Sequence, residues 1–545
     1  MKKIYLKKKL FHILPVCGLI LTATSCSDDF FNLKNPNQVE NTSFWKTEQD
    51  ALMGLTACYD ALQSDNLYDD YLDGGGYGFL MRETTSDNGE HSWGTWMSGS
   101  TVAMGTSGTN DGCFSSYWNA NYELIKRCNL LISNIDESTM GKEMAGRYKA
   151  EAIALRALGY CNLVSLYRDV PYLEKPLTLR EAEAPVEKKE VIAKKVLDDL
   201  AANIPFLPKR GKEAKGRMCQ EAAYAIMGRM ALFTKHYDIA IDAYKKVIGA
   251  YSLFKAGDGT DYQKNFADLF TEANENCNEV ILGVHYKGPG LGEGQTFSIC
   301  WGTPMTAVQA SMNLCDEYYC TDGLPIDKSP LFKGNLEKGG HSRANIDYPR
   351  FENRDPRMKA TLAVPGTEWQ TGMIVGSVKT KNNFNKSTVY IRKWFIPNKT
   401  TNEYDGSFDY YVIRYAEVLL SLAEAMIEKG GYSQAEITPY INEVRSRVGM
   451  PAVERVEGSG LNQEALRSIV RHERRVELAF EDLRLADLYR WNDWENSVKR
   501  MLRDKEWYDG TCYAHDYRGP QDTVWPIPQS EIDTNKKLEQ HAEWK

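Results

Sequence analysis

This chain lacks the features that mark several large classes of protein. Beyond residue 21, no apolar stretch approaches the roughly 18 residues that a membrane-spanning helix needs. The formal net charge is −8 and no basic stripe is interleaved with aromatic residues, so we expect no nucleic-acid partner. The 12 cysteines are scattered and include no Cys-x-x-Cys pair. We expect most of them to be buried free thiols, with a local disulfide between Cys315 and Cys320 as the alternative.

The motifs of common catalytic and metal sites are also missing. His472-Glu473 is not followed by the second histidine of a zinc protease helix, and neither a Gly-x-Ser-x-Gly turn nor a phosphate-binding loop occurs. Residues 69–80 begin like a calcium loop, but Tyr71 and Leu80 stand where oxygen ligands are required. A pair of catalytic carboxylates would be invisible in the sequence, because their separation depends on the fold. We therefore expect no enzyme, no cofactor and no metal, and keep a surface glycoside hydrolase as the alternative.

What is present begins with the amino terminus. Residues 2–9 carry five lysines, residues 10–21 are apolar, and small residues then lead directly to Cys26. This order is typical of a secretory signal, and its apolar run is too short to span a bilayer. The small residues before Cys26 resemble the lipobox of bacterial lipoproteins. That resemblance implies that residues 1–25 are a signal peptide and that Cys26 carries a membrane-anchoring lipid; an ordinary cleaved signal is the alternative.

The rest of the chain has the composition of a folded protein, with 42% hydrophobic, 26% charged and 11% aromatic residues. Its length predicts two interlocked domains or a body built from repeats. Helical periodicity dominates residues 48–250, for example in the apolar stripe of residues 153–167. Further helices are predicted at the following ranges: 413–428, 434–448 and 463–491. Residues 65–112 and 255–408 are expected to be irregular, with short strands such as 279–282.

One segment carries a partial tetratricopeptide pattern. Tyr224, Gly228, Ala240 and Tyr244 occur where that 34-residue repeat has an aromatic, a small residue, an alanine and an aromatic. Small residues let two antiparallel helices approach, while the aromatics fill the space between them. We therefore predict a pair of packed helices between residues 224 and 252.

Nearly all of the chain after Cys26 resembles the SusD/RagB family of nutrient-binding lipoproteins. The motifs that carry the resemblance lie at residues 44–51, 151–157, 166–171, 319–323, 353–357, 413–420, 423–425, 442–447, 473–481, 484–491, 525–528 and 531–532. Two positions depart from the family pattern: Asp482 stands where glycine is common, and residues 540–544 lack the usual ending.

The resemblance implies a mainly α fold: a scaffold of tetratricopeptide-like helix pairs, with irregular loops and short strands carrying the ligand site. Residues 26–255 would form the amino-terminal region. Residues 256–545 would form the carboxyl-terminal region, irregular over 256–409 and helical over 410–500, with a strand at 525–528. It further implies an oligosaccharide-binding protein on the outer face of the outer membrane. In the family an acidic pair such as residues 28–29 helps to direct lipoproteins there; the alternative is that this pair is only a solvated linker. The protein's partner would be a SusC-like TonB-dependent transporter, over which it would act as a lid.

The charged motif at residues 471–484 is better explained by structure than by catalysis. Arginines and glutamates alternate there, beside an apolar seam that includes Val476 and Phe480. Isolated surface pairs at this spacing would contribute little stability. We predict that some of these charges bridge neighbouring helices.

The ligand site is expected on loops that offer flat aromatic rings bordered by polar groups, because sugars present apolar C–H faces with hydroxyl rims. The stretch 77–96 is rich in such residues and is predicted to be an exposed loop, and the resemblance places a second platform near the middle of the chain. The predicted ligand-binding residues are Tyr77, Arg82, Asp87, Asn88, Trp93, Trp96, Tyr286 and Trp301. The alternative is that these aromatics only pin the loops to the helical body, as we expect for Trp118, Trp491 and Trp494.

Other functions remain open at this point. A RagB-like protein would capture peptides and use little stacking at Trp93, Trp96 and Trp301. A structural lipoprotein that binds only other proteins would have no pocket lined with aromatic residues.

Overall fold

The computed structural model describes residues 44–70, 77–91, 98–177, 183–296, 308–370, 373–376, 387–394, 405–508 and 515–545. The predicted signal peptide and lipidation site at Cys26 lie outside the described residues, as do Trp93, Trp96 and Trp301. Over the described part the fold is mostly helical with a few short strands, as the sequence predicts. In that part, no helix combines the length and the apolar character needed to cross a membrane.

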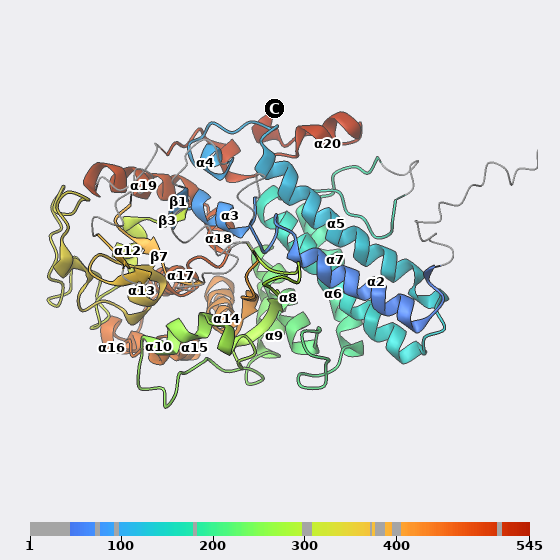
Figure 1. The fold of residues 1–545 in the computed structure, drawn as a ribbon, viewed down its shortest axis with the longest axis horizontal. Coiled ribbons are helices and arrows are strands. Elements are labelled where there is room, and N and C mark those ends of the chain that lie inside the picture. Colours follow the sequence, from blue (N-terminus) through green and yellow to red (C-terminus); the bar gives the residue numbers. More distant parts are fainter. Residues whose placement is uncertain are drawn as a thin grey trace, which may run out of the picture.

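The helices follow one another along most of the chain (Figure 1). Their bounds are α2 (Glu48–Asp60), α3 (Phe79–Thr85), α4 (Ser98–Ala103), α5 (Gly112–Asn134), α6 (Lys142–Tyr167), α7 (Lys189–Asn203), α8 (Gln220–Phe233), α9 (Tyr237–Lys245), α10 (Lys264–Ala267), α12 (Met312–Glu317), α13 (Pro356–Thr361), α14 (Tyr415–Lys429), α15 (Gln434–Arg447), α16 (Val453–Glu457), α17 (Gln463–Leu478), α18 (Arg484–Arg490), α19 (Trp494–Tyr508) and α20 (Gln529–Thr534).

The strands are short. They are β1 (Gly89–His91), β2 (Val280–Val284), β3 (Val308–Ala310), β4 (Leu362–Ala363), β5 (Glu368–Gln370), β6 (Met373–Ile374), β7 (Tyr390–Ile391) and β8 (Tyr410–Arg414). One sheet has the order β1-β3-β7-β4, and two further pairs, β2-β8 and β5-β6, are each antiparallel. The β2-β8 pair confirms the strand predicted near residues 279–282.

Side-chain caps explain where several helices begin. Thr47 and Asp50 form a reciprocal capping box at the start of α2, and Ser433 and Glu436 form another at the start of α15. Asn462 accepts a hydrogen bond from the backbone N–H of Ala465 at the start of α17. Each cap satisfies amide groups that the first helical turn leaves without a partner.

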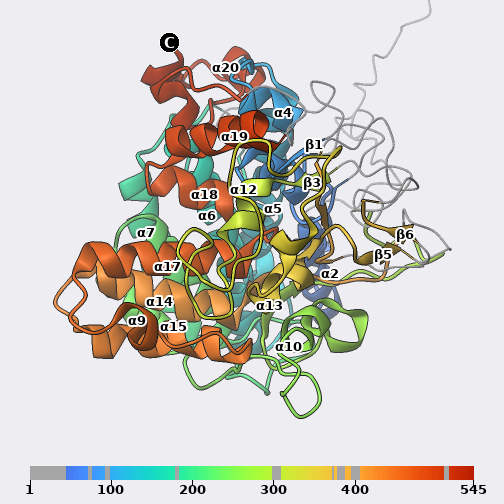
Figure 2. The ribbon, with the colours of Figure 1, turned by 90° about the vertical axis from the view of Figure 1, so that its left-hand side faces the viewer.

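The long helices pack in sequence into one continuous scaffold. Helices α2, α5, α6 and α7 lie side by side at one end of the molecule, and α8 and α9 join them to α14 (Figure 1). Helices α15 and α17 then flank α14 (Figure 2). Apart from a small cluster beneath the β5-β6 hairpin, the buried apolar side chains form one connected core.

The predicted tetratricopeptide-like pair is confirmed in α8 and α9. Gly228 on α8 faces Tyr244 on α9, and a Cβ atom at Gly228 would lie 2.5 Å from the tyrosine ring. Ala240, also on α9, is fully buried. A small residue is therefore needed for the helices to approach, and the aromatic ring fills the space between them.

The predicted long helix over 463–491 is wrong, because the chain breaks between α17 and α18. Phe480 and Asp482 both have positive φ, at 62° and 63°. Phe480 is accordingly buried in a turn rather than on a helical seam. Positive φ is unusual for residues other than glycine, which accounts for the glycine common in the family where this chain has Asp482.

Two other sequence predictions need correction. Residues 79–91, expected to be part of an exposed loop, form α3, a turn and β1, and all are buried. Residues 525–528 form no strand: Trp525 donates its backbone N–H to the carbonyl of Leu166, and prolines at 526 and 528 offer no N–H to a neighbouring strand.

The eight described cysteines are all free. Cys315 and Cys320 are both free and fully buried, and the local disulfide considered as an alternative is not formed between them. Cys58, Cys128 and Cys161 are also fully or almost fully buried, as their apolar neighbours predict.

Candidate functional site

The two segments that carry the predicted tryptophan platforms are bordered by paired strands. Strand β1 runs antiparallel to β3, with Gly89 opposite Ala310 and His91 opposite Val308. His91 is the last described residue before Trp93, and Val308 is the first described residue after Trp301. A Cβ atom at Gly89 would lie 2.5 Å from the carbonyl oxygen of Gln309, so a glycine is required for this approach.

Other described residues extend this arrangement, which we name the strand clasp (residues 69–70, 89–91, 295–296, 308–310, 387 and 406). The backbone N–H of Thr296 donates to the Asp69 carboxylate at 2.8 Å. Gln295 and Gly406 exchange two backbone hydrogen bonds, and the N–H of Ser387 donates to the side chain of Gln309 at 2.7 Å. The residues before Trp301 are therefore joined to Asp69 and Gly406, and those after it are joined to β1 and Ser387.

Arg82 on α3 holds this region to the carboxyl-terminal helices. Its side chain is only 3% exposed and forms a two-point ion pair with Asp482, with N–O distances of 2.7 and 2.6 Å. It also donates to the backbone carbonyl of Leu67, and its guanidinium lies 4.2 Å from the centre of the Tyr117 ring. Burial opposes the charge, but the carboxylate of Asp482 raises the pKa of Arg82 above its usual range. These contacts are structural; ligand contact by Arg82 stays a prediction.

Asp87 is the centre of a buried cluster of charges. Its carboxylate is paired with Arg484 at 2.7 Å, with Arg500 at 2.5 Å and with Arg475 at 3.4 Å. Burial alone would raise the pKa of Asp87, but the three guanidinium groups hold it well below its usual range. Asn88 is equally buried; it donates to Glu83 and accepts from Arg475. Both side chains fix the turn before β1, and their predicted ligand contact is untested.

The two tyrosines of the predicted site differ in exposure. Tyr77 is half-buried, and its ring covers Gly112, where a Cβ atom would lie 2.6 Å from the tyrosine hydroxyl. Tyr286 is 7% exposed and donates its hydroxyl to the carbonyl of Tyr68 at 2.9 Å. Burial raises the pKa of Tyr286 well above its usual range. Tyr77 alone among the predicted residues described here combines an aromatic ring with partial access to solvent.

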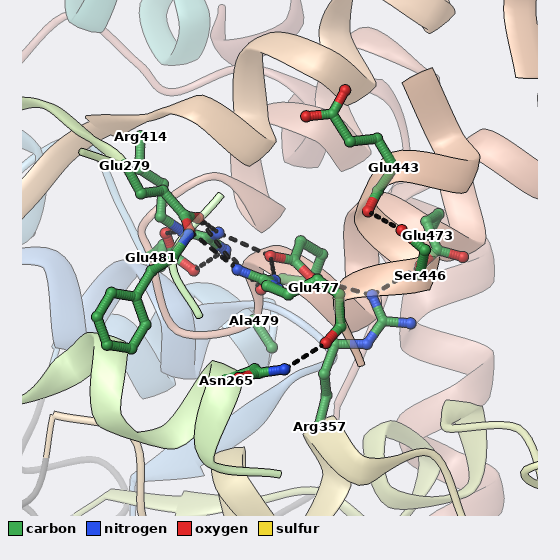
Figure 3. Close-up of polar contacts among 12 residues, drawn as sticks. Asn265, Glu279, Arg357, Arg414, Glu443, Ser446, Glu473, Glu477, Ala479 and Glu481 are labelled. Atoms are coloured by element: carbon green, nitrogen blue, oxygen red, sulfur yellow. Dashed lines mark hydrogen bonds and ion pairs between the residues drawn. The ribbon is translucent and has the colours of Figure 1, made fainter. Parts of the chain in front are cut away.

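The prediction that the charged motif bridges helices is confirmed. Glu477 on α17 pairs with Arg357 at 3.0 Å, with Arg414 at 2.7 Å and with Arg447. Figure 3 shows Glu279 and Glu481 gathered with Glu477 around Arg414. We name the whole group the charge frame: Glu279, Asp355, Glu473, Glu477 and Glu481 with Arg357, Lys393, Arg414, Arg445 and Arg447.

All members of the charge frame are buried, with no side chain more than 5% exposed. The five acidic and five basic side chains carry no net charge together. The frame links α17 to α13, β8 and α15, as well as to residues that precede β2 and follow β7. It therefore joins the helical scaffold to the irregular part of the chain that carries the strand clasp.

The sequence prediction missed the partners that bury Arg82, Asp87 and Asn88. Arg475 and Arg484 belong to motifs that stand out in the sequence, but nothing there shows that they meet a turn almost 400 residues earlier. The only signal in the sequence was chemical: residues 82–88 contain several polar side chains, and residues 471–484 contain four arginines. In the part of the chain that the structure describes, no three His, Cys, Asp or Glu side chains come together as ligands for a metal ion.

The chain matches two protein-family models. One, described as the SusD family, matches residues 256–544, and the other, described as starch-binding associating with outer membrane, matches residues 29–232. SusD-like protein P25 of Formosa agariphila is 23% identical over 558 residues, covering 97% of this chain and 98% of the relative.

Solved structures share the fold. A SusD-like carbohydrate binding protein from Bacteroides fragilis aligns with a TM-score of 0.77 and 24% identity, covering 91% of this chain and 100% of that one. A laminarin binding SusD-like protein aligns with a TM-score of 0.67 and 22% identity, again covering 91% and 100% of the two chains.

Proposed function

Because the chain belongs to the SusD family, we propose that it is a cell-surface lipoprotein that captures oligosaccharides and delivers them to a SusC-like TonB-dependent transporter. The match over residues 256–544 carries this proposal. Two proteins of similar fold, one a SusD-like carbohydrate binding protein and the other a laminarin binding SusD-like protein, support saccharides as the ligand class.

Within this function, Trp93, Trp96 and Trp301 would provide flat apolar surfaces on which sugar rings stack, and Tyr77 would border them. The strand clasp supports this assignment. Strand pairing joins His91, which precedes Trp93, to Val308, which follows Trp301, and a hydrogen bond ties Thr296, which precedes Trp301, to Asp69. Aromatic side chains from two segments anchored side by side can act on one ligand, whereas a single ring would bind weakly.

Attachment to the outer membrane would come from a lipid on Cys26, following removal of residues 1–25. The description of the family matched by residues 29–232 supports association with the outer membrane. The rigid scaffold would then act as a lid over the transporter barrel and bring the bound oligosaccharide to it. The charge frame supports this role, because a lid that moves as one body needs its scaffold and its ligand-bearing part to be firmly joined.

A binding experiment tests the site. Purified protein is titrated by calorimetry with a panel of neutral oligosaccharides, and the tightest ligand is then measured with the Trp93→Ala, Trp96→Ala and Trp301→Ala variants. We expect at least one variant to lose about tenfold in affinity, equivalent to about 1.4 kcal/mol. Trp507→Ala is the matched control, because Trp507 is half-buried on α19, outside the predicted platforms.

Equal binding by all three variants would show that the platforms are wrongly assigned. Binding of peptides but of no saccharide would favour the RagB-like alternative. Turnover of the bound saccharide would favour the hydrolase alternative. Co-purification with an outer-membrane transporter, and its loss when Cys26 is replaced by serine, tests the partner and the anchor.

A further inference from the structure

A concavity lies between α17, the α18–α19 turn and the end of α12. Its volume is about 440 Å³, and it is lined by five arginines (Arg467, Arg471, Arg475, Arg484 and Arg500) together with His472, Tyr319 and Trp491. We name it the arginine pocket. None of its residues belongs to the predicted stacking site.

Most of these arginines already have carboxylate partners. Arg475, Arg484 and Arg500 share Asp87, which is fully buried behind the pocket. Arg467 forms a two-point pair with Glu428, at 2.6 and 2.8 Å. These four guanidinium groups are therefore held in place as part of the wall.

Arg471 is different. Its nearest carboxylate oxygen is on Glu428, 3.7 Å away, and that oxygen already accepts from Arg467. The Nε atom of Arg471 is buried and has no hydrogen-bond partner. Its guanidinium lies 4.7 Å from the centre of the Trp491 ring, which fixes the orientation of the planar group. The Arg471 side chain is still 31% exposed, so its terminal nitrogens remain within reach of a ligand and are held only by this loose pair with Glu428. The buried Nε lacks a partner, and an unsatisfied donor of this kind is costly.

The aromatic rings of the pocket are not free to stack on a ligand. Trp491 is covered by Arg471 and also by Arg490, which lies 4.8 Å from the ring centre. Tyr319 is stacked on His472 at 3.8 Å. A neutral sugar, which binds largely through stacking, therefore finds no flat apolar surface here.

The rim of the pocket supplies hydrogen-bond acceptors. Glu464 is exposed and Asp493, which accepts from Arg500 at 2.8 Å, is half-buried. Both line the pocket, as do Glu317 and the exposed Ser468. Carboxylates at the rim would repel a ligand with many negative charges, such as a polyphosphate. They are well suited to accept hydrogen bonds from sugar hydroxyls.

We propose that the arginine pocket binds an acidic saccharide, with a uronic acid carboxylate on the Arg471 guanidinium and the sugar hydroxyls on Glu464 and Asp493. Arginine matches a carboxylate by two parallel N–H···O bonds, which gives both strength and orientation. This inference rests on the proposed carbohydrate binding and extends it to a second, charge-selective site.

The test compares charged and neutral forms of the same sugars. The full protein is titrated by calorimetry with D-glucuronate, D-galacturonate, D-glucose, D-galactose and sodium sulfate. We expect the uronates to bind at least tenfold more tightly than the neutral sugars, and Arg471→Gln to lose at least tenfold in uronate affinity. Ser468→Glu, which adds a carboxylate beside Arg471 at an exposed position, should abolish uronate binding as well.

Arg503→Gln is the matched control, because Arg503 lies over the Trp507 ring at 4.6 Å but is outside the pocket. It should bind uronates like the original protein, and thermal unfolding should show all variants folded. Unchanged uronate binding in Arg471→Gln, absence of uronate binding, or sulfate binding as tight as uronate binding would each overturn the proposal. Loss of uronate binding in Trp301→Ala but not in Arg471→Gln would overturn it too. If the uronate test fails, the protein can still bind neutral oligosaccharides. If the proposed function is wrong, the titration with neutral oligosaccharides will show no binding.

Discussion

Replacing Glu477 by glutamine should be among the most damaging single changes in this protein. Its carboxylate is fully buried and touches three guanidinium groups, on Arg357, Arg414 and Arg447. The charge frame carries no net charge, so Glu477→Gln leaves one uncompensated positive charge in the interior. Removing one partner of a buried ion pair typically costs about 3–5 kcal/mol of unfolding free energy. We expect a loss in this range.

Urea unfolding followed by circular dichroism gives the measurement. The matched control is Glu495→Gln on α19, where the carboxylate pairs with Lys499 at 2.7 Å but both side chains are more than half exposed. Such a surface pair should contribute under about 0.5 kcal/mol. The contrary result is that Glu477→Gln lowers the free energy of unfolding by less than about 1 kcal/mol while the slope of that free energy against urea concentration stays unchanged. In that case the charge frame does not stabilise the fold as we infer.

The effect should also depend on pH in a defined direction. Burial alone would raise the pKa of Glu477, but Arg447, Arg414 and Arg357 hold it well below its usual range. Glutamates in the unfolded chain take up a proton near pH 4.3, while the folded protein keeps Glu477 ionised. The stability that Glu477 contributes is therefore fully present above about pH 5 and is lost only on further acidification.

Two further predictions concern packing and buried acids. Gly228→Ala should lower the free energy of unfolding by about 1–3 kcal/mol, because the new methyl group would lie 2.5 Å from the Tyr244 ring. The control is Gly146→Ala on α6, where the nearest neighbour is 3.5 Å away and the change should be neutral or stabilising. Equal effects of the two changes in thermal unfolding would refute this. Burial raises the pKa of Asp504 to about 7, so between about pH 4 and 7 the folded protein keeps this proton while the unfolded chain has lost it. As the pH rises through this range, the free energy of unfolding should therefore fall by about 1.4 kcal/mol per pH unit. Asp504→Asn should remove this contribution to the pH dependence. Urea unfolding of the original protein and the variant at pH 5 and pH 8 measures the difference.

Local patterns in the sequence were enough to predict the helical frame. The helix pair at 224–252 is confirmed because Gly228 and Tyr244 make a contact whose requirements are visible in a single repeat. The bridging role of Glu477 is confirmed for a similar reason: arginines and glutamates that alternate on one helix need partners on other helices. Neither inference needed knowledge of distant parts of the chain.

The errors arise where distant residues decide the structure. Arg82, Asp87 and Asn88 have the polarity of an exposed loop, and their burial depends on distant partners that include Asp482, Arg475, Arg484 and Arg500. Helical periodicity continues through residues 479–483, but tertiary packing imposes positive φ on Phe480 and Asp482. The glycine common at position 482 in the family was the one local sign of that turn.

The distance between Arg82 and Asp482 along the chain has a consequence for how this protein matures. The two residues are 400 positions apart, and Asp87 and Arg500 are 413 apart. A polypeptide made from its amino terminus therefore presents a charged, unpaired segment long before the helices that neutralise it have emerged. Such long-range closure is intrinsically slow. Final assembly must wait for the last quarter of the chain, and a nascent protein truncated before residue 482 lacks the carboxylate that pairs with Arg82.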